Sequence, residues 1–431
     1  MRKAIHVGLL GLGTVGTGVV KILANNANSI AQKVGADIQI KKIMVRNPDK
    51  SRSVAVDELI TTRLEDIIDN PDIDIVVEVM GGETPAKDYM LKALQAGKHV
   101  VTANKDVMAR YGRELFTAAE ENKLDLMFEA SVGGGIPIIR PLKQCLAGNK
   151  ISEVMGIVNG TTNYMLTKMT NEGLDFEEVL AEAQAKGYAE SDPTADVGGL
   201  DAARKIAILA SIAFGARVSV DDVSVEGITS LSKADIGYAS ELGYVIKLLG
   251  IAKEDEKGID VRVHPAFVAK NHPLAAVQDV FNAIFVKGDA VGEAMFYGRG
   301  AGEMPTASAV VADIIDVARD IQHGVSSRIL CTCFDQKPIC PVEKTESQYY
   351  VRLLVEDKPG VFAAIAGAFA AELVSLNSVI QKRKVNCCAE VVLITNRVPD
   401  ANLRSAIGII KSMSVVNQIR SVIRVETETI G

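Results

Sequence analysis

The stretch that decides the fold is Ala4-Ile5-His6-Val7-Gly8-Leu9-Leu10-Gly11-Leu12-Gly13-Thr14-Val15-Gly16. It begins as an apolar run, becomes a turn of the pattern G-x-G-x-x-G, and is followed by helical spacing over Val15–Leu23. In such a unit the first glycine permits a tight turn, the second lets a pyrophosphate approach the backbone, and the third lets helix pack on strand. The pattern predicts a dinucleotide site, with a purely structural turn as the alternative. The expected cofactor-binding residues are Gly11, Gly13, Thr14, Val15 and Gly16.

Strand and helix patterns alternate downstream of this unit. The expected strands are Ile38–Val45, Ile73–Met80, His99–Thr102 and Leu124–Glu129, with helical patterns such as Lys87–Ala96 and Gly112–Asn122 between them. Alternating βαβ units favour a parallel, doubly wound sheet. The fold class predicted for residues 1–130 is therefore α/β, a Rossmann dinucleotide-binding domain.

The second expected strand ends in Arg46-Asn47-Pro48-Asp49-Lys50. A site for NAD usually carries Asp or Glu at this point to bind the ribose hydroxyls, whereas Arg46 can cover a 2′-phosphate. The sequence therefore favours NADP over NAD. A solvated charge at the end of a strand is the alternative for Arg46.

The sequence changes in character at Ser131. Expected helices are Ile138–Leu146, Asn163–Glu172, Phe176–Lys186 and Leu200–Phe214, and expected strands are Glu153–Val158, Asp260–Phe267 and Phe281–Lys287. This mixture predicts an α+β domain over residues 131–302. A glycine-rich return, Tyr297–Gly302, then precedes a helical pattern over Met304–Arg319.

Residues 326–347 carry prolines and mixed charges and are expected to form a linker. The patterns after it are Tyr349–Glu356, Val361–Leu373, Ser375–Arg383, Glu390–Thr395, Asp400–Lys411 and Val415–Glu426. They follow the order βαββαβ, which predicts a small ferredoxin-like domain over residues 348–431.

Composition excludes several classes of protein. The chain has 431 residues, 48% of them hydrophobic, and a net charge of −7, so nucleic acid is not an expected partner. Its longest apolar runs, Val361–Ala371 and Ile206–Ala216, are too short for a bilayer that needs about 20 residues, so no membrane span is expected. His6 interrupts the run after Met1, which argues against a signal peptide.

Six cysteines are sparse for this length and favour a reducing, cytoplasmic location. Cys331, Cys333 and Cys340 follow His323, but they lack the two close pairs typical of a zinc site. We expect these cysteines to be structural.

Carboxylates gather just before and inside one predicted helix. They are Glu190, Asp192, Asp196 and Asp201, and Lys205 follows them. Asp201 and Lys205 are four residues apart and share one helix face. A surface ion pair is the alternative, but such pairs contribute only about 0–1 kcal/mol, and this density of acids favours the positioning of a polar ligand.

A second lysine, Lys105, follows the expected strand His99–Thr102. In an open α/β sheet the carboxyl ends of the strands face the ligand crevice. Lys105 is therefore expected where cofactor and substrate meet, and a solvated loop lysine is the alternative.

At this point the residues match a known family. Ala183–Lys205 resembles the signature of homoserine dehydrogenases and carries its spaced Gly, Glu, Asp-Pro, Asp, Gly, Asp and Lys in order. Similar stretches are Gly11–Gly16, Thr102–Lys105, Glu129–Pro137 and Asn159–Tyr164, and the resemblance covers about residues 1–325.

The resemblance implies interconversion of L-aspartate 4-semialdehyde and L-homoserine with a nicotinamide cofactor, on the route to threonine, methionine and isoleucine. It makes Lys205 the acid/base and Lys105 the second catalytic lysine. Glu190 and Asp201 would hold the substrate's amino group, and Thr161, Tyr188 and Asp196 would complete the pocket. An ammonium group near the carbonyl suits this role, because hydride addition builds negative charge on that oxygen.

The resemblance also extends the cofactor site. It adds Thr102 and Lys105 and, from the loop Gly300–Thr306, Gly302. In the family this loop returns toward the nicotinamide before a helix packs on the nucleotide domain. Residues 303–325 are therefore expected to belong with residues 1–130, leaving 131–302 as a catalytic and dimerisation domain.

A monovalent cation, usually sodium, is a further feature of this family. Its ligands would be the Glu129 carboxylate and the backbone carbonyls of Val132, Gly134 and Ile136. A structural turn stapled by Glu129 explains the same residues.

The stretch Val355–Phe362 resembles the opening of an ACT domain, a module that pairs with other copies and binds amino acids. The implied effector is L-threonine, and the implied assembly is a homo-dimer or homo-tetramer. An oligomerisation module that binds nothing is the alternative.

Two other functions compete with this one. One is a non-catalytic protein that senses nucleotides and amino acids, against which the set Lys105, Glu190, Asp201 and Lys205 argues; the other is a dehydrogenase for another small amino or hydroxy acid. Since no kinase-like segment precedes Met1, a fused aspartokinase is not expected.

Overall fold

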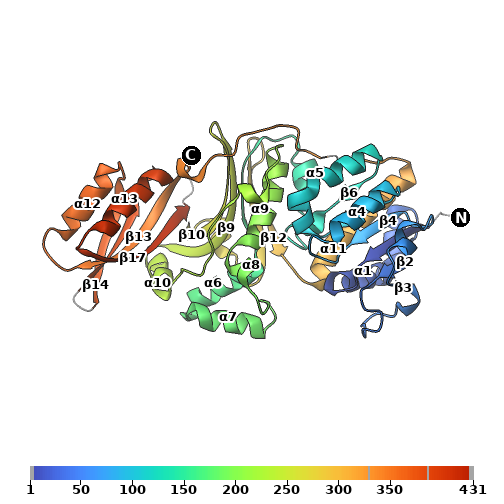
Figure 1. Ribbon diagram of the computed structural model, residues 1–431, viewed down its shortest axis with the longest axis horizontal. Helices are drawn as coiled ribbons and strands as arrows, with labels where there is room; N and C mark the ends of the chain where they lie inside the picture. The colour runs from blue at the N-terminus through green and yellow to red at the C-terminus, as the bar shows by residue number, and fades with distance from the viewer. Residues whose placement is uncertain (1–3, 329–330, 386–387, 427–431) are drawn as a thin grey trace. The chain divides into compact units, whose positions relative to one another are not determined.

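The computed structural model describes residues 4–328, 331–385 and 388–426 (Figure 1). Its contacts divide the chain into two compact units. The first comprises Met1–Val154, Arg204–Asp222 and Phe281–Lys337, and the second Met155–Ala203, Val223–Val280 and Pro338–Gly431.

The first unit is organised around a parallel sheet. Its strands are β1 (Ile5–Leu10), β2 (Ile38–Met44), β3 (Ile60–Thr61), β4 (Ile75–Glu78), β5 (His99–Thr102) and β6 (Leu126–Met127). They lie in the order β3-β2-β1-β4-β5-β6 with all neighbours parallel, which confirms the predicted doubly wound α/β sheet. The strand order reverses between β1 and β4, and ligands of such sheets bind outside the carboxyl ends at this point.

Helices cover this sheet (Figure 1). They are α1 (Thr14–Asn25), α2 (Ala27–Val34), α3 (Glu65–Ile68), α4 (Ala86–Gln95), α5 (Lys105–Glu121) and α11 (Glu303–His323). α1, α2 and α11 share one hydrophobic core with the strands. α11 approaches α1 closely at Gly18, where an added Cβ would lie 2.5 Å from the carbonyl oxygen of Glu303, and Lys21 donates a hydrogen bond of 2.7 Å to the Glu303 side chain.

The first unit also contains an antiparallel hairpin of β11 (Phe281–Gly288) and β12 (Gly292–Arg299), and a π-helical turn at Pro141–Cys145. Two elements cross the division between the units. They are β7 (Ile151–Ile157) and α9 (Leu200–Ala213), and the latter enters the first unit at Arg204.

The second unit carries a mixed sheet. Its strands are β8 (Ser224–Val225), β9 (Tyr244–Asp255), β10 (Gly258–Ala269), β13 (Glu346–Glu356), β14 (Leu376–Val385), β15 (Cys388–Thr395), β16 (Val398–Pro399) and β17 (Val416–Glu426). The order β9-β10-β17-β13-β15-β14 is antiparallel except for the parallel pair β10–β17.

The helices of the second unit complete it. They are α6 (Gly160–Glu172), α7 (Phe176–Ala185), α8 (Thr194–Val197), α10 (Lys233–Glu241), α12 (Val361–Ala371) and α13 (Asp400–Ser412). From β13 onward the chain runs β13-α12-β14-β15-α13-β17, with the short β16 before α13, and α12 and α13 share a core with these strands. This is the βαββαβ succession expected from the sequence.

Several predicted boundaries differ from the structure. The helix expected at 112–122 begins at Lys105, because the Asn104 side chain accepts the Val107 N–H at 3.1 Å and caps an earlier start. The strand expected at 124–129 shortens to β6, and Glu129 opens a 3-10 turn, Glu129–Ser131. Tyr297, expected in a glycine-rich return, pairs within β12, and β13 begins at Glu346, inside the expected linker. β9 has no counterpart among the expected strands.

No helix among the described residues is long and apolar enough to cross a membrane.

Candidate active site

The glycine-rich turn between β1 and α1 borders a cavity of about 470 Å³. Gly11 has φ +103°, and a Cβ added to Gly16 would lie 2.3 Å from the Gly11 carbonyl oxygen, so both positions require glycine. A Cβ on Gly13 would meet nothing within 4 Å. Gly11 and Gly13 both line the cavity, and the exposed Thr14 begins the helix beside them.

The loop after β2 supplies the charge of this cavity. Arg46, Lys50 and Arg52 line it, and none of its described lining residues is an acid. The Arg52 guanidinium donates to the backbone carbonyls of Asn47 at 2.5 Å and Pro48 at 2.7 Å. Arg52 therefore shapes the loop that presents Arg46. The sequence reasoning missed Arg52, and the only signal for it was a second arginine six residues after the first.

The carboxyl ends of β4 and β5 are joined by buried polar side chains. Thr102 Oγ1 donates to Glu78 Oε2 at 2.6 Å, and Glu78 Oε1 accepts the Met80 N–H at 2.8 Å. Burial raises the pKa of Glu78, although these hydrogen bonds oppose the shift. The Thr102 side chain is fully buried against Glu78, so a cofactor could contact only the backbone of Thr102.

Lys105 occupies the first position of α5, directly after the N-cap Asn104, at this same edge of the sheet. Lys205 lies on α9. The residues next to them form an ion pair of 2.8 Å, between Arg204 Nε and Asp106 Oδ1. Within the first unit, the two predicted catalytic lysines therefore sit on two helices that are tied together beside them.

In the second unit, the predicted substrate residues meet around Asn159. Its Nδ2 donates to Asp196 Oδ1 at 2.7 Å and to Asp201 Oδ2 at 2.8 Å, while its Oδ1 caps α6 by accepting the Thr162 N–H at 2.9 Å. Asn159 was absent from the predicted site, although it opens one of the resembling stretches. Its buried amide holds two carboxylates of the signature in fixed positions.

The other predicted substrate residues lie at the margin of this network. Thr161 Oγ1 donates to the Tyr188 carbonyl oxygen at 2.6 Å, which joins the start of α6 to the segment after α7. Glu190 is exposed, and its backbone carbonyl accepts from the Gln184 side chain at 3.1 Å. Asp201 is buried in the first turn of α9, one helical turn before Lys205.

The predicted cation ligands form a buried turn in the first unit. Glu129 Oε1 accepts the N–H groups of Ile138 at 2.6 Å and Ile139 at 2.8 Å, and Oε2 accepts that of Arg140 at 2.7 Å. Val132, Gly134 and Ile136 are buried beside it, and Gly134 has φ +55°.

Comparison with known proteins places the chain among its relatives. The model of the NAD-binding domain of homoserine dehydrogenase matches residues 11–129, and the homoserine dehydrogenase model matches residues 137–315. A homoserine dehydrogenase of Synechocystis sp. is 49% identical, over 98% of this chain and 99% of its own. The chain belongs to the homoserine dehydrogenase family.

Solved structures of the family agree. A homoserine dehydrogenase from Thiobacillus denitrificans has 43% identity and a TM-score of 0.95, with 99% of both chains covered. A hyperthermophilic archaeal homoserine dehydrogenase in complex with NADPH has 26% identity and a TM-score of 0.63, covering 73% of this chain and 97% of its own.

The activity expected from the resemblance is thereby confirmed. The chain is an NAD(P)-dependent homoserine dehydrogenase, an oxidoreductase of aspartate-family amino-acid biosynthesis. Its substrates are L-homoserine and L-aspartate 4-semialdehyde.

Proposed function

We propose that this homoserine dehydrogenase uses NADP in preference to NAD. The observation that carries the proposal is the charge of the cofactor cavity, where Arg46, Lys50 and Arg52 gather and the described lining contains no acid. A 2′-phosphate gains from these cations, whereas ribose hydroxyls have no carboxylate partner among them. The archaeal relative solved with NADPH supports the same preference.

In the proposed mechanism Lys205 gives a proton to the substrate's carbonyl oxygen, and Lys105 stabilises the same developing charge. Bound NADPH supplies the hydride. Asp201 and Glu190 hold the substrate's α-ammonium group, with Thr161, Tyr188 and Asp196 around it. The hydrogen bonds of Asn159 to Asp196 and Asp201 support this assignment, because they fix the spacing of two acids that a cationic ligand would bridge.

One assay tests substrate, cofactor and acid/base together: oxidation of NADPH and of NADH is followed with L-aspartate 4-semialdehyde. We expect the Lys205→Ala variant to lower kcat by about 10²–10⁴-fold with a modest change in KM. Lys92→Ala, an exposed lysine of α4, is the matched control. Activity of Lys205→Ala within about twofold of wild type would remove Lys205 from the mechanism, and a strong preference for NADH would overturn the NADP proposal.

A structural sodium ion is proposed at the Glu129 turn, held with the carbonyls of Val132, Gly134 and Ile136. The oxygen donors suit a hard cation, and a carboxylate with about four lone-pair sites keeps room for one contact beyond its three N–H bonds. Those same bonds support the alternative of a turn stapled by Glu129 alone. A thermal midpoint that rises in sodium chloride but not in choline chloride favours the ion; equal midpoints favour the staple.

We further propose an ACT domain over residues 348–431, after a linker at 326–347, with L-threonine as effector. The turn before α12 supports it, because the exposed N-cap Gly360 supplies no side-chain cap, and the N–H groups of such a helix start can bind a carboxylate. Exposed Phe362, Leu373 and Val379 on the same module favour pairing with a second copy, in a dimer or tetramer. Unchanged kinetics across millimolar threonine, with no heat of binding, would leave an oligomerisation module only.

The domain limits 1–130 with 303–325, and 131–302 for catalysis and dimerisation, remain our proposal for how the activity is distributed. A cytoplasmic location is proposed with them. It is supported by the free thiols of Cys145, Cys331, Cys333, Cys340 and Cys388, which suit a reducing compartment.

A further inference from the structure

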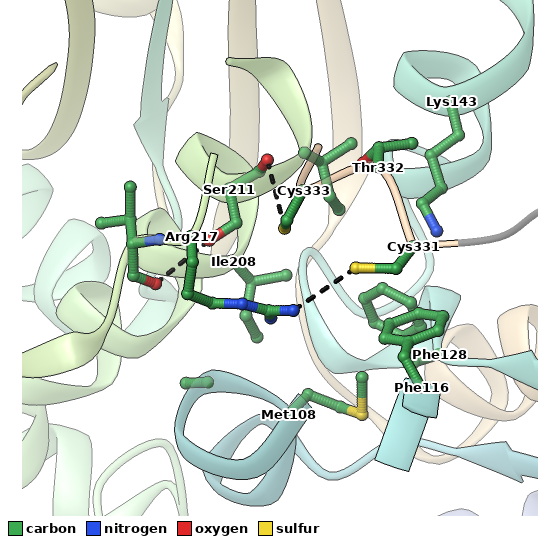
Figure 2. Close-up of a pocket in the computed structure, with 13 residues that line it drawn as sticks. Met108, Phe116, Phe128, Lys143, Ile208, Ser211, Arg217, Cys331, Thr332 and Cys333 are labelled. Atoms are coloured by element: carbon green, nitrogen blue, oxygen red, sulfur yellow. Dashed lines mark hydrogen bonds between the residues drawn. The ribbon is translucent and has the colours of Figure 1, made fainter. Parts of the chain in front are cut away.

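A second, smaller cavity lies within the first unit, and it has no part in the site described above (Figure 2). It has a volume of about 20 Å³, room for about one water molecule. α5 and α9 contribute apolar side chains to it, and the segment Cys331-Thr332-Cys333 contributes two sulfur atoms.

Two cationic side chains flank the first of these sulfurs. Arg217 Nη2 donates to Cys331 Sγ at 3.3 Å. Figure 2 shows Cys331 between Arg217 and Lys143, whose Nζ lies 4.9 Å from the ring centre of Phe116. Burial lowers the pKa of Lys143 to about 8, so its amine still carries charge at neutral pH. Positive charge on two sides favours the thiolate form of a cysteine.

The second sulfur, that of Cys333, has different surroundings from the first. Cys333 Sγ donates a weak hydrogen bond of 3.8 Å to the carbonyl oxygen of Ser211. Hydrogen bonding with Cys333, together with Arg217 and Lys143, holds the pKa of Cys331 below its ordinary value, while interaction with Cys331 and burial raise that of Cys333. The surroundings of Cys331 therefore favour the thiolate, and those of Cys333 favour the thiol.

This arrangement disfavours a metal ion. A cation bound to the two sulfurs would be repelled by Arg217 and Lys143. Among the described residues, no cluster of three or more side chains that could hold a metal includes this pair. A nucleophilic thiolate with an adjacent thiol is instead the pattern of cysteines that oxidants modify.

We propose that Cys331 is a modification site for hydroperoxides and that Cys333 is its resolving thiol. The Cys331 thiolate attacks one oxygen of the hydroperoxide, an S–O bond forms, the O–O bond breaks, and the leaving alkoxide or hydroxide takes up a proton. The Cys333 sulfur then attacks the sulfenic sulfur, the S–S bond forms, and water leaves. In sum, two thiols and one hydroperoxide give one disulfide, one alcohol or water, and one further water.

Modification here would reach the helices that carry the proposed catalytic lysines. Met108 and Ile208 line the cavity, three residues after Lys105 on α5 and three after Lys205 on α9. The cavity holds about one water molecule, so a rearranged sulfur pair would have to move the side chains that line it. This link to activity rests on the proposed roles of the two lysines, whereas the thiol chemistry does not.

The test uses the reduced full-length enzyme and hydrogen peroxide, followed by non-reducing digestion and mass spectrometry. We expect the peptide with Cys331 and Cys333 to lose two hydrogen atoms well before the exposed Cys145 is oxidised. In Cys333→Ser the sulfenic acid should accumulate on Cys331 and be trapped by dimedone, and Cys331→Ser should give neither product. Oxidation of Cys331 no faster than that of Cys145 overturns the proposal.

The thiolate character of Cys331 is measured separately, as the rate of its alkylation by iodoacetamide between about pH 6 and 9. Cys331 should reach half-maximal rate at a lower pH than Cys145, and Arg217→Met should slow its alkylation at pH 7 by about tenfold while Arg217→Lys largely restores it. Equal profiles for Cys331 and Cys145 in the wild-type enzyme contradict a stabilised thiolate.

Activity is measured on the same oxidised samples. A fall in NADPH oxidation that dithiothreitol reverses, and that Cys331→Ser does not show, supports the link to α5 and α9. Disulfide formation with an unchanged rate overturns that link and leaves the modification site standing. An enzyme inactive before oxidation would instead contradict the proposed function, since the mass readout is independent of it.

Discussion

Two glycine-rich turns of the first unit, Gly11–Gly16 and Gly133–Gly135, look alike in sequence but have different structural roles. A Cβ on Gly13 would meet nothing within 4 Å, since the residue faces the cofactor cavity. A Cβ on Gly134 would lie 2.3 Å from the carbonyl oxygen of Gly300. The first turn thus keeps open space beside the cavity at Gly13, whereas the second lets the protein's own backbone approach at Gly134.

The helix starts that follow the two turns differ in the same way. α1 begins at Thr14, and its N-cap Gly13 supplies no side-chain cap. We propose that a phosphate of the cofactor satisfies its first N–H groups. The N–H groups of residues 138–140 are instead satisfied by the Glu129 carboxylate. In the second turn the anion is the protein's own Glu129 carboxylate. In the first turn the anion would be a phosphate of the cofactor.

The largest effect is expected from closing the second turn with one methyl group. Gly134→Ala places a Cβ against the Gly300 carbonyl at a residue with φ +55°, so both contact and backbone conformation oppose it. We expect a loss of about 3 kcal/mol or more of stability, measured as a lower thermal midpoint or as loss of soluble protein.

Gly148→Ala is the matched control, because a Cβ there meets nothing within 4 Å and its φ is not in the left-handed region. Its midpoint should stay close to wild type. If Gly134→Ala has the same thermal midpoint as this control, glycine is not required at residue 134 for the close approach of the two loops.

Removing the built-in anion should cost less. Glu129→Gln keeps the shape of the side chain but turns an NH₂ group toward backbone donors that the carboxylate now accepts. We expect a destabilisation of about 2 kcal/mol, detected in chemical unfolding, because buried donors lose partners. Glu177→Gln, an exposed acid in the first turn of α7, should change stability by no more than about 0.5 kcal/mol. Equal midpoints for the two variants would argue against Glu129 as the staple.

The sequence predicted the structural context of the first turn, between a strand and a helix, but not that of the second, for a physical reason. The roles of Gly11, Gly13 and Gly16 are decided within six residues by one strand and one helix, so the pattern carries its own context. The role of Gly134 depends on Gly300, which lies far along the chain. The sequence did not predict Asn159 as a site residue for the same reason, because its partners Asp196 and Asp201 are 37 and 42 residues away. Side chains that act on distant partners leave no local spacing to detect.

A smaller effect is expected at Gly13, where an added Cβ enters the cavity and no protein atom. Gly13→Ala should leave the thermal midpoint unchanged and raise the KM for NADPH by about tenfold, since it displaces the pyrophosphate from the start of α1. Steady-state kinetics and melting curves of the same preparation check both halves. A variant that melts early with an unchanged KM would make this turn structural, like the second one.

The smallest effect is expected at Arg46, the cation beside the first turn. It tests whether Arg46 binds the 2′-phosphate of the cofactor. Arg46 is exposed on a loop that Arg52 holds in shape, so Arg46→Ala removes a cation and leaves the fold intact. Hydrogen bonds to charged groups contribute about 1.5–3 kcal/mol, and exposure reduces this, so the KM for NADPH should rise by about fivefold while that for NADH stays level. Arg63→Ala, an exposed arginine of the same unit that does not line the cavity, should alter neither. The ratio of the two KM changes is the measurement: a parallel rise for both cofactors would mean that Arg46 supports the loop rather than binding a 2′-phosphate.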